Sequence, residues 1–115
     1  MPEGISLSHF IGMSTDSRIT LFRQDIQAGD IVYVKTQNST YSLYAREDGV
    51  FEITGGWFDK RGVSPFITKI NGCTYGGSMI NIRTIAVCGL CIEFGNNVRT
   101  STVQKIFVNR YFKHN

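Results

Sequence analysis

Apolar and polar residues alternate in short blocks along this chain, and residues typical of turns separate the blocks. The alternation is clearest in three consecutive segments, residues 31–36, 40–46 and 50–54. A period of two places every second side chain on the same face, as in a strand with one buried face. The tripeptide Glu47-Asp48-Gly49 suits a hairpin loop with Gly49 at positive φ. The pattern therefore predicts a three-stranded antiparallel meander.

The later part of the chain predicts further short strands. Residues 66–71, 79–87 and 90–94 are rich in β-branched and other apolar residues. The glycine-rich segment 72–78 is typical of a turn, and residues 55–65, which lack clear alternation, indicate a loop.

Two segments, residues 15–27 and 101–112, fit a helix as well as a strand. Ile19, Phe22 and Ile26 have helical spacing in the first, and the second begins with a possible capping box. Each also contains a strand-like apolar run. We expect strands in both, because the neighbouring strands need their edges covered.

Together these elements predict one all-β domain over residues 1–115, an antiparallel β-barrel or sandwich of about seven or eight short strands. The turn Gly29-Asp30 followed by Ile31-Val32-Tyr33-Val34 is similar to the entry of small SH3-like barrels, which implies a barrel of that type.

Composition supports a single folded domain. The chain has 115 residues, of which 42% are hydrophobic and 18% charged, unlike a disordered segment. No apolar run approaches the ~20 residues of a membrane helix, so a membrane is not an expected partner. The N-terminal residues lack a basic region followed by an apolar stretch, so we expect no secretory signal.

Charge is distributed unevenly along the chain. Residues 1–59 hold four basic and eight acidic residues, and residues 60–115 hold eight basic residues and one acid, giving net charges of −4 and +7. One interpretation is that the two halves pair within one small sheet. The alternative is a basic face, or a dipolar molecule that associates with itself head to tail.

Cys73, Cys88 and Cys91 predict free thiols in a reducing compartment, the cytoplasm. Cys88 and Cys91 have C-x-x-C spacing, but the flanking residues indicate strands rather than the strand-to-helix context of a redox motif. A zinc site would need His9 or His114 as a fourth ligand. We expect no metal and no cofactor, only small buried thiols.

Signals for an enzyme are weak. His9 and His114 lie near the chain ends, no Gly-x-Ser-x-Gly motif is present, and segment 72–78 lacks the Gly-Lys-Ser/Thr ending of a phosphate loop. We expect no catalytic residues. A small hydrolase or nuclease that uses His9 or His114 is the least favoured alternative.

The loop at residues 55–65 holds the candidate ligand-binding residues. An aromatic pair beside two cations is typical of a protein-binding hot spot, and also of a site that stacks on a base and contacts phosphate. The candidates are Trp57, Phe58, Lys60 and Arg61, joined by Tyr75 and Arg83 from later in the chain. The alternative is that Trp57 and Phe58 fold inward and close one end of the domain.

The sequence thus predicts a non-enzymatic binding module for a protein partner, or for a second copy of itself in a homo-oligomer. Binding of RNA or single-stranded DNA is the main alternative. The two differ in salt dependence, because nucleic-acid binding releases counterions and weakens steeply with salt.

Overall fold

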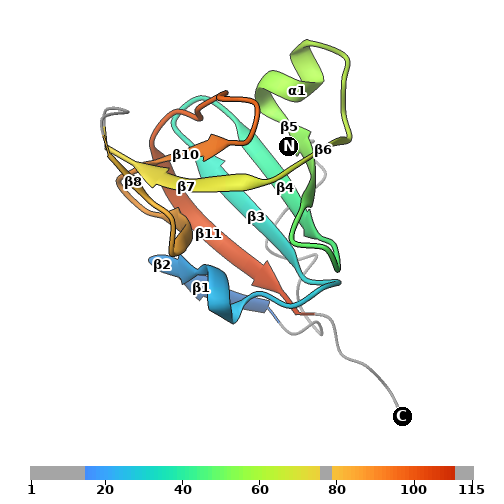
Figure 1. Ribbon diagram of the computed structural model, residues 1–115. Coiled ribbons are helices and arrows are strands. Elements are labelled where there is room, and N and C mark those ends of the chain that lie inside the picture. The colour runs from blue at the N-terminus through green and yellow to red at the C-terminus, as the bar shows by residue number, and fades with distance from the viewer. Residues whose placement is uncertain (1–14, 76–78, 111–115) are drawn as a thin grey trace.

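The computed structural model describes residues 15–75 and 79–110. One layer is a six-stranded antiparallel sheet in the order β1-β11-β3-β4-β5-β6 (Figure 1). In that order its strands are Thr15–Arg18, Val103–Asn109, Ile31–Thr36, Thr40–Ala45, Phe51–Gly55 and Phe66–Thr68.

Two smaller antiparallel sheets form a second layer over one face of the large sheet. The first has the order β10-β7-β8, with strands Cys91–Phe94, Ile70–Thr74 and Ile80–Asn81. The second pairs β2 (Thr20–Phe22) with β9 (Thr84–Val87). The ribbon shows β7 and β10 crossing in front of β3 and β4 (Figure 1).

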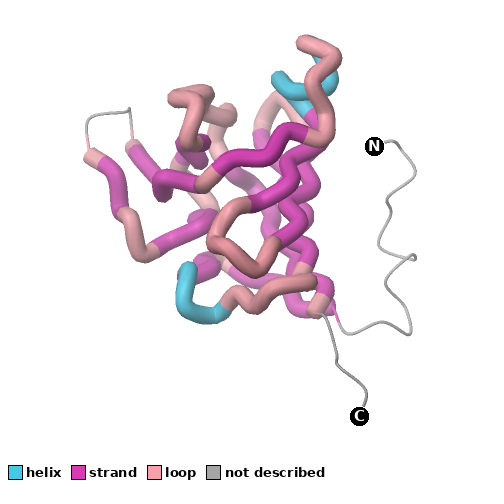
Figure 2. Tube along the Cα trace, turned by 45° about the vertical axis from the view of Figure 1, so that its right-hand side comes forward, coloured by secondary structure: helices cyan, strands magenta, loops and turns pink. Residues whose placement is uncertain are grey.

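Two short helical segments lie at opposite ends of the molecule (Figure 2). The 3-10 turn η3 (Arg23–Asp25) follows β2, and the helix α1 (Gly56–Lys60) follows β5. None of the helices in the described residues is long and apolar enough to span a membrane.

The meander β3-β4-β5 shows why alternation predicts this fold. Val32 pairs with Leu43, and Leu43 pairs with Ile53, and all three side chains are fully buried. Burying each such side chain contributes about 1.5–3 kcal/mol. The second layer supplies the other side of the same core with residues such as Ile92 and Phe94.

The predicted all-β, antiparallel fold is confirmed, including the meander and the positive φ of Gly49, which is +83°. Of the two predicted alternatives, barrel or sandwich, the closed barrel is wrong, and the SH3-like type is not confirmed. β1 and β6 are the two edges of the large sheet and do not pair, because much of the later chain forms a separate layer instead.

The described residues form eleven strands rather than seven or eight, since three predicted strand segments are each divided, among them residues 15–27, which form β1 and β2. Residues 66–71 divide between β6 and β7 at Lys69. Residues 79–87 divide between β8 and β9 at a turn in which the Arg83 amide donates to Asn81 Oδ1 at 3.0 Å.

The two ambiguous segments form β1, β2 and β11, which confirms the expectation of strands, although η3 adds a helical turn. The prediction of a turn at residues 72–78 is wrong for Gly72 to Thr74, which belong to β7, and residues 76–78 lie outside the described residues. The loop at residues 55–65 contains α1, whose five residues are too few to give a clear helical periodicity.

Candidate functional site

The loop at α1 is fixed by local hydrogen bonds. Asp59 Oδ1 accepts from the Gly55 amide at 2.9 Å and from the Ser64 hydroxyl. The Trp57 amide donates to the Tyr41 hydroxyl at 3.4 Å. These bonds join the start of α1, the following loop and β4, so the helix is held firmly on the end of the sheet.

Phe58 is fully buried, which agrees with the alternative that this ring folds inward rather than with a surface contact to a ligand. The centroid of its ring lies 5.0 Å from the ring centroid of Phe94 and 5.3 Å from that of Phe66. Trp57 is half-buried and packs edge-on against Phe58, with 5.2 Å between the ring centroids. Much of the aromatic pair therefore belongs to the core.

The two cations of this loop remain at the surface. The Arg61 guanidinium lies 5.0 Å from the centre of the Trp57 ring, a cation–π contact. Neither Lys60 nor Arg61 forms an ion pair with any described residue. Lys60 lines a depression of about 560 Å³ on the outer face of the large sheet.

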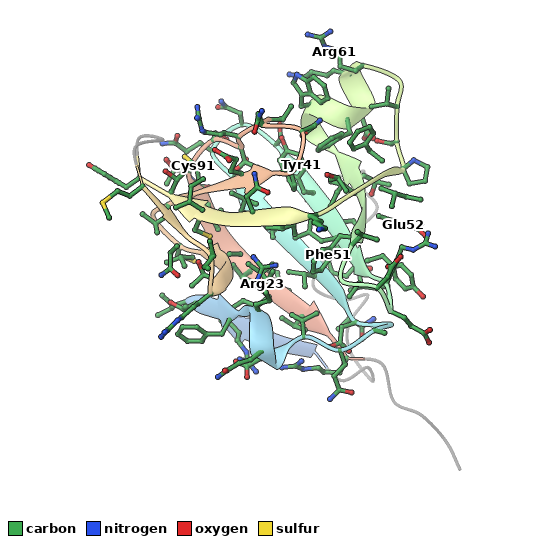
Figure 3. The ribbon with its side chains drawn as sticks, viewed as in Figure 1. Arg23, Tyr41, Phe51, Glu52, Arg61 and Cys91 are labelled. Carbon is green, nitrogen blue, oxygen red and sulfur yellow. The ribbon has the colours of Figure 1, made fainter. Side chains whose placement is uncertain are left out.

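The structure separates Tyr75 and Arg83 from the α1 loop. Arg61 projects beside α1, whereas Arg23, whose amide donates to the Arg83 carbonyl at 2.7 Å, lies at the lower side of β7 (Figure 3). The six predicted residues thus do not form one site: Arg83 lies beside Arg23, and Tyr75 follows the end of β7.

The region around Arg23 and Arg83 contains a groove of about 690 Å³, which we call the basic groove. It lies between η3, the start of β7, the β8–β9 turn and the β4–β5 hairpin. Its lining residues are Phe22, Arg23, Gln24, Gly49, Lys69, Ile70, Asn71, Ile82 and Arg83. Three of these carry positive charge and none carries negative charge.

Arg23 is held in place by neutral partners. Its Nε donates to the Ile82 carbonyl at 2.9 Å, and its Nη2 donates to the Ile70 carbonyl at 2.8 Å. Carbonyl oxygens carry no formal charge, so the guanidinium is positioned without being neutralised. Lys69 and Arg83 form no ion pair with any described residue.

One acidic residue, Glu93, is linked to the groove by a hydrogen bond from the lining residue Asn71. Asn71 Nδ2 donates to Glu93 Oε2 at 2.9 Å, and Arg99 Nε donates to Glu93 Oε1 at 3.0 Å. The Asn71 bond and the Arg99 pair hold the pKa of Glu93 below its ordinary value, although burial opposes the shift. Glu93 is therefore an ionised carboxylate already neutralised by Arg99.

Beside the groove, the β7–β8 hairpin exposes a set of apolar side chains that we call the hairpin surface. Its members are Tyr75, Met79, Ile80 and Ile82, and Tyr75, Met79 and Ile82 are 79%, 81% and 68% exposed. Thr74 pairs with Ile80, which brings Tyr75 and Met79 close together at the end of the hairpin. Ile82 also lines the basic groove, so the two features adjoin.

Sequence reasoning missed most of this region. The basic excess of residues 60–115 was the available signal for Lys69 and Arg83. Ile80 and Ile82 have the β-branched side chains of a core strand, and nothing in their spacing indicates that the second layer leaves them uncovered.

The cysteines provide no clear chemistry. Cys88 Sγ donates to the Gln104 carbonyl at 3.3 Å, and a turn leads from β9 into β10 with no helix in the described residues that follow. Burial raises the pKa of the Cys73 thiol. The part of the chain described by the structure holds no group of three or more metal-binding side chains, and His9 and His114 lie outside it.

Comparison with protein-family models, with curated proteins and with solved structures finds no match to this chain.

Proposed function

We propose that this chain is a non-enzymatic binding module that docks a segment of a protein partner on the hairpin surface. The observation that carries the proposal is the exposure of three apolar side chains on one hairpin, Tyr75, Met79 and Ile82, at 79%, 81% and 68%. Exposed apolar side chains gathered on one hairpin, with a basic groove adjoining them, can serve as a protein-binding surface.

The scaffold beneath this surface supports binding without large rearrangement. β7 pairs with both β10 and β8, and the buried Cys73 and Thr74 join it to the core layer. A surface held in its bound shape loses less conformational entropy when the partner docks.

A nucleic-acid ligand is the second candidate, because Arg23, Lys69 and Arg83 line one groove together with Phe22. The hairpin surface favours protein instead. Three of its four members, Met79, Ile80 and Ile82, are aliphatic, and only Tyr75 offers a ring for base stacking, which is the main apolar contact in single-strand binding.

We propose that the partner segment belongs to another protein. A second copy of this chain is the alternative partner, and sedimentation velocity distinguishes the two. The thiols of Cys73, Cys88 and Cys91 are free, and we propose the cytoplasm as the compartment. The likeness to SH3-like barrels is confined to the entry at residues 29–34 and supports no part of this proposal.

Fluorescence anisotropy with short synthetic peptides tests the proposal. One peptide set places leucines among polar residues, and the matched set replaces every leucine with serine. We expect binding of the leucine set alone, lost in Met79→Ser and Ile82→Ser. Val63→Ser is the matched control, because Val63 is an exposed apolar residue beyond α1, outside both site features.

Equal binding of both peptide sets, or unchanged binding in the two hairpin variants, would contradict the proposal. Sedimentation velocity of the chain alone separates the alternative partner. A stable dimer that Ile82→Ser dissociates would show that the surface binds a second copy rather than another protein.

A further inference from the structure

Resting on the proposed function, we infer that the partner segment is acidic and that its anionic oxygens, from carboxylate or phosphoryl groups, enter the basic groove. The hairpin surface would bind the apolar side chains of the segment. The positive charge of the groove would favour apolar segments that also carry acidic groups over those that do not.

Arg23 is the fixed element of this site. Its Nε and Nη2 donate to backbone carbonyls, and its Nη1 forms no hydrogen bond with a described residue. The bonds that orient the guanidinium are already made in the free protein. An anion that binds here therefore meets a guanidinium that is already oriented, is not paired with a carboxylate and keeps Nη1 as a donor. Hydrogen bonds between such a cation and an anion are stronger than those between neutral groups.

Lys69 and Arg83 extend the positive charge along the groove. Each reaches it from a short connection, Lys69 between β6 and β7 and Arg83 between β8 and β9. Asn71 separates the groove from Glu93, which Arg99 already neutralises. Glu47 and Asp48 lie in the hairpin loop before Gly49. Neither forms an ion pair with any described residue, so neither neutralises a cation of the groove by direct contact.

The groove also has an apolar part, formed by Phe22, Ile70 and Ile82. Its volume of about 690 Å³ lies within the range of small-molecule binding sites. Because Ile82 belongs to both features, a segment that mixes apolar and acidic side chains can contact the groove and the hairpin surface together.

Matched peptides test the inference by fluorescence anisotropy. The first carries leucine and glutamate, and its twins replace the glutamates with glutamine or with phosphoserine. A labelled single-stranded oligonucleotide is a separate arm. We expect the glutamate peptide to bind about tenfold or more tightly than its glutamine twin at low salt, with the difference shrinking as salt rises.

The variants Lys69→Glu and Arg83→Glu should remove this preference and leave the binding of the glutamine peptide nearly unchanged. Lys105→Glu is the matched control, since Lys105 is an exposed lysine of β11, in the other layer. Tighter binding of the phosphoserine peptide than of the glutamate peptide would identify phosphoryl groups as the source of the anion, and the reverse order would identify carboxylates.

The outcomes separate the inference from the function on which it rests. Equal affinity for the glutamate and glutamine peptides, unchanged by Arg83→Glu, would overturn the inference and leave the apolar docking intact. Failure of every leucine-containing peptide to bind would overturn both. Tighter binding of the oligonucleotide than of any peptide would overturn the inference in favour of a nucleic-acid ligand.

Discussion

Gly72 lies in the middle of β7 with a φ of +145°, and a side chain there would overlap the backbone of Asn81 in β8. Glycine is thus required twice, for its dihedral angle and for the close approach of the two strands. Gly49 also has positive φ, at +83°, but open space surrounds it.

Gly72→Ala should therefore lower the free energy of unfolding by more than Gly49→Ala does. We expect about 1–2 kcal/mol for Gly49→Ala from the dihedral angle alone, and a larger loss for Gly72→Ala because β8 must also move. Denaturant titration of both variants measures the difference. Equal losses would show that the close approach of β7 and β8 is unimportant for stability.

Trp57 is a second residue whose role a substitution can assign. Because its indole is half-buried against Phe58, Trp57→Ala should lower the free energy of unfolding by about 2–3 kcal/mol, less than the 3–5 kcal/mol of a core tryptophan. Arg61→Ala removes only an exposed cation–π contact and should cost about 0.5–1 kcal/mol. Thermal melts and a peptide-binding assay of both variants check these values. If Trp57→Ala lost binding without losing stability, the binding site would lie at α1 instead.

Among the elements, those with one buried face were predictable. Val32, Leu43 and Ile53 alternate with outward residues, so β3, β4 and β5 follow from the sequence almost to the residue. β11 was harder to predict, because Val103, Ile106 and Phe107 also fit a helical face. Its pairing with both β1 and β3 settles the strand, and that pairing is a long-range contact.

The candidate site was predictable only in part. Trp57, Lys60 and Arg61 are adjacent in sequence, and the C-terminal basic excess pointed to Lys69 and Arg83. The groove itself requires Arg23 and Arg83 to meet across sixty residues of chain. Short strands such as β8, with two residues, are defined by their neighbours rather than by periodicity.

The bond network of Glu93 joins β7, β10 and the loop after β10, and it predicts a pH dependence. Because the folded state holds the pKa of Glu93 below its ordinary value of 4.5, the stabilisation is complete above that value. It is lost as the pH falls through the folded-state pKa, since the protonated carboxyl no longer pairs with Arg99.

Thermal melts between pH 7 and pH 3 of the native chain and Glu93→Gln test this prediction. The variant should be less stable at neutral pH, and the two curves should converge in acid. If the stability difference between the native chain and Glu93→Gln were the same at every pH, the ionisation of Glu93 would not contribute to stability.

At the scale of the whole molecule, the opposite charges of the two chain halves do not simply cancel by pairing. Arg110–Asp30 is the one pair among the four ion pairs of the described residues that joins the two halves. Arg18–Asp25 and Arg46–Glu52 lie within the acidic half, and Arg99–Glu93 lies within the basic half. The excess basic residues, Lys69 and Arg83 among them, therefore stay available at the surface.

The pair that does join the halves should contribute strongly to stability. Asp30 is buried, and its Oδ2 lies 3.1 Å from Arg110 Nη1. Arg110→Ala would remove a charged partner from this buried carboxylate, and we expect a loss on the order of 3 kcal/mol. Arg46→Ala is the control, since its pair with Glu52 is partly exposed and should contribute about 0–1 kcal/mol. Similar losses in denaturant titrations of the two variants would contradict this role for Arg110.

Mapping the bound peptide by NMR tests the central claim most directly. The leucine–glutamate peptide is titrated into isotope-labelled protein, and the backbone amide shifts are followed. We predict that the largest shifts fall in residues 69–75, 79–83 and 22–24, around the hairpin surface and the basic groove. Shifts confined to α1 and the outer face of the large sheet would contradict the claim and place the binding site at Trp57 instead.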